Sequence, residues 1–130
     1  MRGGEVKEGH SQMRMLMDDL PAPSKDIAAR ILQEVDFEHR LAGGYLHEHA
    51  GVMMFWLYSV EEVFTLLNSP CPQINLGDLE RWLREVIKDK DLADHIQWLT
   101  TQHPTLQKRL MAIRNALGLR LIQCRQICAA

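Results

Sequence analysis

The sequence predicts an all-α protein, folded as a compact helical bundle of about five helices. Proline ends a helix and restrains the residue before it, so the three groups of prolines divide the chain into long proline-free segments. These prolines are Pro21, Pro23, Pro70, Pro72 and Pro104. Within each segment the apolar residues recur three or four positions apart, whereas the alternation of period two that indicates a β-strand is nowhere sustained.

The N-terminal residues 1–12 contain three glycines and charges of both signs, a composition typical of a flexible tail. We therefore expect one helical domain at residues 13–130. It would open with a short helix over residues 13–20, which ends at the proline-containing sequence "PAPS".

The segment from Lys25 to Leu67 carries the longest apolar stripe, and Ser24 before it is suited to cap a helix. The stripe consists of Ile31, Val35, Glu38, Ala42, Tyr45, His49, Met53, Trp56, Val60, Val63 and Leu67. One straight helix of this length would measure about 64 Å, which is more than a compact domain needs. We therefore expect a long helix that is broken or bent near Gly43-Gly44 or near Gly51.

Three further helices are predicted in the second half of the chain. Asn75 is suited to cap the first of them, and Asp91 the second. The first carries Leu79, Trp82, Leu83 and Val86, and the second carries Leu92, Ile96 and Leu99. The third is the C-terminal helix, with one face made by Leu106, Leu110, Ile113, Leu117, Leu121, Cys124 and Cys128.

Composition predicts a cytoplasmic protein that binds neither nucleic acid nor membrane. The formal net charge of −2 provides no overall attraction to nucleic acid or to an anionic lipid surface. No apolar run reaches the roughly 18 residues of a transmembrane helix, and the N-terminus lacks the apolar core of a signal peptide. The chain has three cysteines, an odd number, so a disulfide framework is not expected.

Glu38 and His49 lie inside the apolar stripe, where we expect them to point towards other helices. A buried carboxylate or imidazole must be paired, hydrogen-bonded or bound to metal. The pattern resembles that of the ferritin-like di-iron bundles, whose Glu and Glu-x-x-His residues project inward, and this resemblance implies a divalent metal or cofactor site. In the similar motif "DFEH" at residues 36–39, Asp36 lies on the far side from the stripe and His39 on its flank. We therefore favour a structural role for Glu38 and His49 and predict no cofactor.

Arg40 and His47 fall on the opposite side of the predicted helix. With six residues between them, they resemble the Arg-x4-6-His pair of the HEPN-type ribonucleases, which are small all-α domains that act as dimers. The resemblance implies that the pair would stabilise and protonate groups at the scissile phosphate of an RNA. The alternative, which we favour, is an i,i+4 ion pair between Asp36 and Arg40 beside a solvated His47.

The C-terminal helix has an uneven charge, because residues 101–130 contain no Asp or Glu. Their basic residues are Lys108, Arg109, Arg114, Arg120 and Arg125. On a helical wheel Arg109 and Arg120 flank one edge of the apolar face, and Arg114 and Arg125 flank the other, so the arginines do not form one basic stripe. Flanking charges of this kind pair with acidic residues on neighbouring helices, so we predict no nucleic-acid surface here.

The other side of the same helix carries a second apolar patch, formed by Met111, Leu119 and Ile122. A helix that is apolar on two faces must be buried on both. We therefore predict a homodimer in which this patch packs against its copy, with Arg114 or Arg125 near acidic residues of the partner. The expected function is a small, non-catalytic interaction or regulatory module, which could also bind a protein partner.

Overall fold

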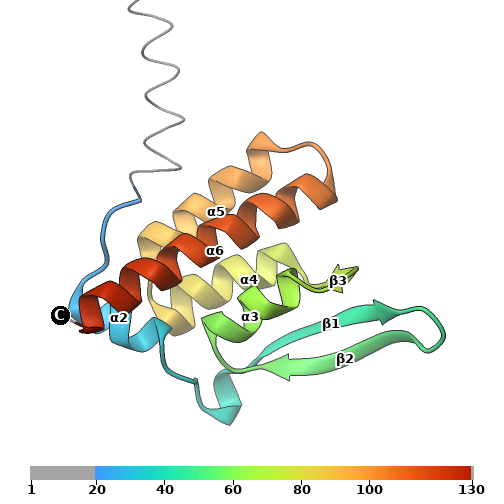
Figure 1. The fold of residues 1–130 in the computed structure, drawn as a ribbon, viewed down its shortest axis with the longest axis horizontal. Helices are drawn as coiled ribbons and strands as arrows, with labels where there is room; N and C mark the ends of the chain where they lie inside the picture. Colours follow the sequence, from blue (N-terminus) through green and yellow to red (C-terminus); the bar gives the residue numbers. More distant parts are fainter. Residues whose placement is uncertain (1–19, 130) are drawn as a thin grey trace, which may run out of the picture.

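The computed structural model describes residues 20–129, in which a small antiparallel sheet is joined to a body of helices. Strands β1 (Leu41–His47) and β2 (Gly51–Leu57) form a β-hairpin that extends away from the helices (Figure 1). Strand β3 (Pro72–Gln73) pairs with the other side of β1, which gives the strand order β2-β1-β3. The fold is therefore mixed α/β.

Five α-helices and two short helical turns make up most of the other described residues. They are α2 (Lys25–Ile31), η1 (Phe37–His39, 3₁₀), α3 (Val60–Leu67), α4 (Leu76–Trp82), η2 (Leu83–Ile87, π), α5 (Lys90–Gln102) and α6 (Leu106–Ala129). Helix α6 packs on α2, α3 and α5, and Figure 1 shows α5 and α6 side by side. The hydrophobic core therefore forms around α6.

The prediction of an all-α helical bundle is wrong. The long helix expected over residues 25–67 is replaced by α2, the hairpin and α3. Gly43 and Gly44, which were expected to bend that helix, lie within β1. Gly51, the other expected site of a bend, is the first residue of β2.

The sequence of β2 explains why the helical spacing was misleading. Every residue from Val52 to Leu57 is apolar or aromatic, and such a run satisfies a spacing of three or four as well as a spacing of two. The turn before β2 gives a clearer signal. Gly51 has a φ of 78°, a left-handed conformation that glycine adopts without strain and that closes a short hairpin loop.

Several helix boundaries agree with the sequence. Ser24 and Asn75 cap α2 and α4 through their side chains, as predicted. Helix α5 is capped by Asp89 rather than by Asp91. Helix α3 has a cap that was not predicted, in which the Ser59 hydroxyl accepts a hydrogen bond from the Glu62 amide.

Helix α6 has the predicted buried face in its middle section. Ile113, Leu117 and Leu121 are almost completely buried. Leu106 and Cys128, near the two ends of the helix, are exposed.

The predicted tail at residues 1–12 and most of the predicted helix at residues 13–20 lie outside the described residues. None of the helices within residues 20–129 has the length and apolar content needed to span a membrane.

A buried ion pair joins α6 to the start of α5. Nε and Nη2 of Arg120 donate hydrogen bonds to the two carboxylate oxygens of Asp89, at 2.8 and 2.9 Å, and both side chains are almost fully buried. Nη1 of Arg120 donates to the carbonyl oxygen of Pro21 at 2.6 Å and to Oε1 of Gln123 at 2.8 Å. The position expected for Arg120, at the edge of an apolar face, is therefore wrong: it lies in the core.

Breaking this ion pair should destabilise the fold strongly. Arg120→Leu leaves the Asp89 carboxylate buried without a counter-charge, and we expect a loss of about 3–5 kcal/mol in the free energy of unfolding. Urea denaturation followed by circular dichroism measures this loss.

The matched control removes both charges. Asp89→Ser retains a side-chain oxygen that can cap α5, so the double variant Arg120→Leu, Asp89→Ser should be more stable than Arg120→Leu alone. Strictly additive losses for the two substitutions would show that the two charges do not depend on each other.

Stability should also decrease in acid because of His95. This side chain is buried and stacks on Trp98, with ring centroids 6.1 Å apart. Burial, and secondarily the positive charge of Arg120, lowers the pKa of His95 from its ordinary value of 6.5. The unfolded chain therefore takes up a proton that the folded chain resists, and stability is lost as the pH falls below about 6.5. Urea denaturation measures the free energy of unfolding at pH 7.5 and at pH 5.5. The difference between these two values should be smaller for His95→Phe than for the parent protein.

Candidate interaction surface

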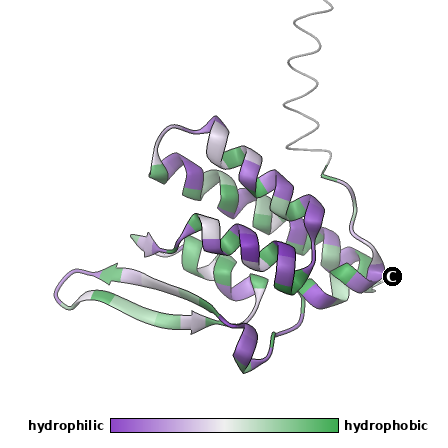
Figure 2. Ribbon diagram, turned by 180° about the vertical axis from the view of Figure 1, so that it is seen from behind, coloured by the Kyte–Doolittle hydropathy of each residue, from purple (hydrophilic) through white to green (hydrophobic). Residues whose placement is uncertain are grey.

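The β-hairpin carries exposed apolar side chains on both of its faces. Residues directly opposite each other in an antiparallel pair share a face, and successive residues alternate between faces. We call the side that carries Leu46, Val52, Met54 and Trp56 the outer face, and the side that carries Tyr45, Met53 and Phe55 the inner face. Strand β2 is coloured as hydrophobic along most of its length in Figure 2.

On the outer face, Arg40 is held between two aromatic rings. Its guanidinium carbon lies 3.8 Å from the ring centroid of Phe37 and 4.1 Å from that of Trp56. Nη1 of Arg40 also donates a hydrogen bond of 2.7 Å to the carbonyl oxygen of Phe37. These contacts tie η1 to the base of β2, and they keep the Trp56 ring in place while leaving 49% of that residue exposed.

On the inner face, the base of the hairpin packs on α3, and the remainder borders an apolar groove. A side chain at Gly43 would meet Leu57 and Leu66, which shows how closely the strand lies against α3. The groove has a volume of about 430 Å³ and is lined by Tyr45 of β1, by Phe55, Trp56 and Leu57 of β2, by residues of α3 and by Ser69 after it. Tyr45 and Phe55 contact each other, with ring centroids 5.9 Å apart.

The two edges of the sheet differ. The edge formed by β3 is only two residues long and contains Pro72, which has no amide hydrogen to donate. The edge formed by β2 is seven residues long. Within residues 20–129, β1 is the only strand that pairs with β2, so the edge of β2 that points away from β1 is free. Strand β2 contains no charged residue and no proline, the features with which proteins usually protect an exposed edge.

The hairpin turn is organised by a histidine. Nδ1 of His47 accepts hydrogen bonds from the backbone amides of His49 and Ala50, each at 3.2 Å. The His47 ring also lies edge-on to that of His49, with centroids 6.3 Å apart. His47 therefore has a structural role in the turn.

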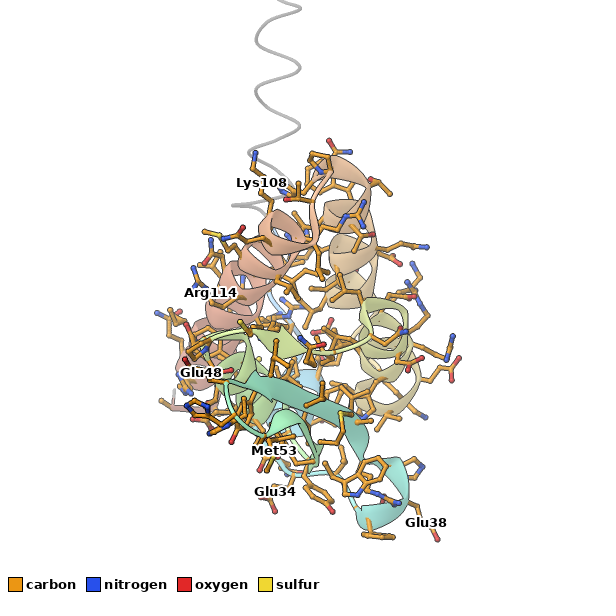
Figure 3. The ribbon with its side chains drawn as sticks, turned by 90° about the vertical axis from the view of Figure 1, so that its right-hand side faces the viewer. Glu34, Glu38, Glu48, Met53, Lys108 and Arg114 are labelled. Carbon is orange, nitrogen blue, oxygen red and sulfur yellow. The ribbon has the colours of Figure 1, made fainter. Side chains whose placement is uncertain are left out.

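The predicted burial of Glu38 and His49 is not found. Glu38 lies in η1 and His49 in the hairpin turn, and both are exposed. Figure 3 shows Glu38 directed away from the helices, far from Glu48, which precedes His49. Both residues were assigned to one helix face only because the segment was taken to be helical. Within residues 20–129, no three His, Cys, Asp or Glu side chains are grouped so that they could hold a metal ion.

Arg40 and His47 are also separated. Arg40 precedes β1 and His47 ends it, so about 23 Å of extended chain lies between them. The expected ion pair between Asp36 and Arg40 is not formed either, because Asp36 pairs with His39 at 2.5 Å. The arrangement does not bring Arg40 and His47 to one phosphate.

The second apolar patch on α6 is exposed, as expected for an interface. Met111, Leu119 and Ile122 are each 46–51% exposed. Arg125, one of its predicted neighbours, pairs with Glu61 of the same chain at 3.3 Å, and Figure 3 shows Arg114 on the surface of α6. That this patch forms a dimer interface stays a prediction.

The basic residues of α6 do not gather on one surface. Arg120 is buried, and Nε of Arg109 donates to the carbonyl oxygen of His103 at 2.7 Å. Arg125 is engaged with Glu61. The predicted pairing with acidic residues is therefore found for Arg120 and Arg125, whereas Arg109 contacts a backbone carbonyl instead.

Sequence reasoning missed the hairpin surface altogether. The signal was present in the apolar run "GVMMFWL" that follows the turn sequence "HEHA".

Comparisons of the chain with protein-family models, with curated proteins and with solved structures give no match.

The glycines of β1 provide a test of how tightly the hairpin is built. A Cβ atom at Gly44 would collide with the backbone oxygen of Met53, whereas at Gly43 it would meet the movable side-chain ends of Leu57 and Leu66, at 2.7 and 3.0 Å. We therefore expect Gly44→Ala to destabilise the hairpin more than Gly43→Ala. Amide hydrogen exchange of β1 and β2 measures this difference, and equal protection in the two variants would contradict it.

Proposed function

We propose that the protein is a non-catalytic interaction module that acts as a homodimer, and that the β-hairpin is its binding surface. The observation that carries this proposal is the run of five consecutive apolar side chains from Val52 to Trp56, each 36–63% exposed. Exposed apolar patches of a few hundred Å² usually mark sites of protein or membrane interaction. The exposed Leu46 on β1 lies opposite Val52 and widens this surface near the hairpin tip.

The way the hairpin is held also supports a binding role. Its base is fixed by the Arg40 stack and by α3, while its distal half extends beyond the helical body (Figure 1). Apolar side chains held in place before binding lose little conformational entropy when a partner covers them. The hairpin is therefore suited to binding through shape and burial.

We also propose that the protein resides in the cytoplasm. The described residues include three free cysteines, and Cys71 and Cys128 are exposed. Exposed thiols persist in a reducing compartment and are oxidised elsewhere. This supports the location that the sequence predicts.

The oligomeric state and two matched variants test the homodimer. We expect the parent protein to sediment as a dimer at about 10 μM, corresponding to a dissociation constant in the micromolar range or below. Val52→Lys together with Met54→Lys places two charges on the outer face, and should yield a folded monomer because burying an unpaired charge is costly. Sedimentation equilibrium and circular dichroism measure assembly and folding.

Leu119→Lys together with Ile122→Lys is the control on α6, with the same number of charges at positions of similar exposure. This variant should remain a dimer. If it is monomeric while the hairpin variant is a dimer, the interface is the α6 patch predicted from the sequence. A parent protein that stays monomeric at about 100 μM would overturn the proposed homodimer.

A further inference from the structure

Strand β2 presents apolar side chains on two opposite faces at once. Val52, Met54 and Trp56 lie on the outer face, and Met53 and Phe55 on the inner face. A partner that stacks on one face of the hairpin would leave the other face in water. A strand that adds along the edge of β2 contacts side chains of both faces and also satisfies the backbone groups of the edge.

Strand β2 is suited to pair with itself. It has no charged side chain, so an antiparallel copy places no like charges opposite each other. Residues that lie opposite each other across two antiparallel strands share a face of the sheet, whereas neighbours along one strand lie on opposite faces. The two-fold axis must therefore pass next to one residue, which then lies opposite its own copy, and not midway between two neighbouring residues. An axis at Met54 sets Val52 opposite Trp56 of the second copy, and Met53 opposite Phe55 of the second copy. Each of these pairs combines an aromatic ring with an aliphatic or sulfur-containing side chain, which are favourable partners across strands.

The exposed area favours β2 over α6 as the surface shared by two copies. At roughly 200 Å² for a fully exposed side chain of this size, residues Val52 to Trp56 expose about 500 Å² per chain. The three residues of the α6 patch expose about 300 Å² by the same reckoning. Two copies of β2 thus bring about 1,000 Å² of exposed apolar surface to the edge, and the flanks of these side chains that lie beside the partner strand are covered when the two strands pair.

We propose that two copies of the chain pair their β2 strands antiparallel about a two-fold axis at Met54, which joins the two sheets into one sheet of six strands. This inference rests on the proposed homodimer and identifies how its subunits meet. Each copy supplies the same edge, so the interface is isologous. The outer faces of the two hairpins lie on the same side of the joined sheet.

Cysteine crosslinking tests the register of this pairing. Cys71 and Cys128 are exposed and are first replaced by Ser, whereas Cys124 can stay, because burial raises the pKa of its thiol to about 11 and keeps it unreactive at pH 8. In this background Met54→Cys places two thiols beside the axis. The Cα atoms of opposed residues in antiparallel strands are about 4.5–5.5 Å apart, which a disulfide can bridge. Mild oxidation should convert this variant almost completely to a covalent dimer, as seen on a non-reducing gel.

Val52→Cys is the matched control on the same face. Its thiol would lie about 13 Å along the strand from its copy, so oxidation should give no covalent dimer. Val52→Cys combined with Trp56→Cys restores an opposed pair and should crosslink again. Circular dichroism verifies that each variant is folded before oxidation.

Other crosslinking patterns would overturn the proposal in recognisable ways. Covalent dimer from Val52→Cys alone contradicts the axis at Met54, because it requires either an axis at Val52 or outer faces that stack on each other. Crosslinking at Met53→Cys or Phe55→Cys, with none at Met54→Cys, contradicts the axis at Met54. If the protein sediments as a dimer but no β2 position crosslinks, the edge pairing is wrong and the proposed homodimer still stands. If the parent protein is monomeric, the proposed function itself is wrong.

Discussion

The ion pair between Arg120 and Asp89 joins segments that are far apart in the sequence. Asp89 lies between the π-helical turn η2 and helix α5, and it also caps that helix by accepting a hydrogen bond from the amide of Leu92. Arg120 fixes this point to the middle of α6 and, through Pro21, to the start of the described chain. Two buried charges are stable only together, so helices α5 and α6 have one favourable alignment. The remaining helices pack around α5 and α6.

The hairpin depends on this body but adds little to its core. The buried side chains of the hairpin are Leu41 and Leu57, at its base, while Val52 to Trp56 remain exposed. The bond from Trp82 Nε1 to the carbonyl oxygen of His39, at 2.7 Å, anchors η1 and thus the start of β1 to α4. The exposed part of the hairpin therefore lies outside the hydrophobic core, which supports a role in binding.

The sequence predicted the helical second half of the protein much better than its first half. The apolar residues of α4, α5 and α6 recur at the helical spacing of three or four, and Asn75 caps α4 as expected. The hairpin was missed because an apolar strand exposed on both faces lacks the alternation by which strands are recognised. The burial of Arg120 could not be predicted, since its counter-charge is 31 residues away and the pairing depends on the packing of α5. Glu38 and His49 were misplaced because the assumed helix was absent.

The unequal edges of the sheet limit how large an assembly built by strand pairing can become. Pro72 and the short length of β3 close one side to further strands, and a strand that pairs with β2 occupies the long edge on the other side. Fibres grow because every added unit exposes a new copy of the surface it has used. In the proposed dimer the first addition consumes that surface, so a higher concentration of protein would increase the fraction of paired chains and not the size of the particle. An apolar strand that would otherwise promote aggregation is thereby compatible with a particle of fixed stoichiometry.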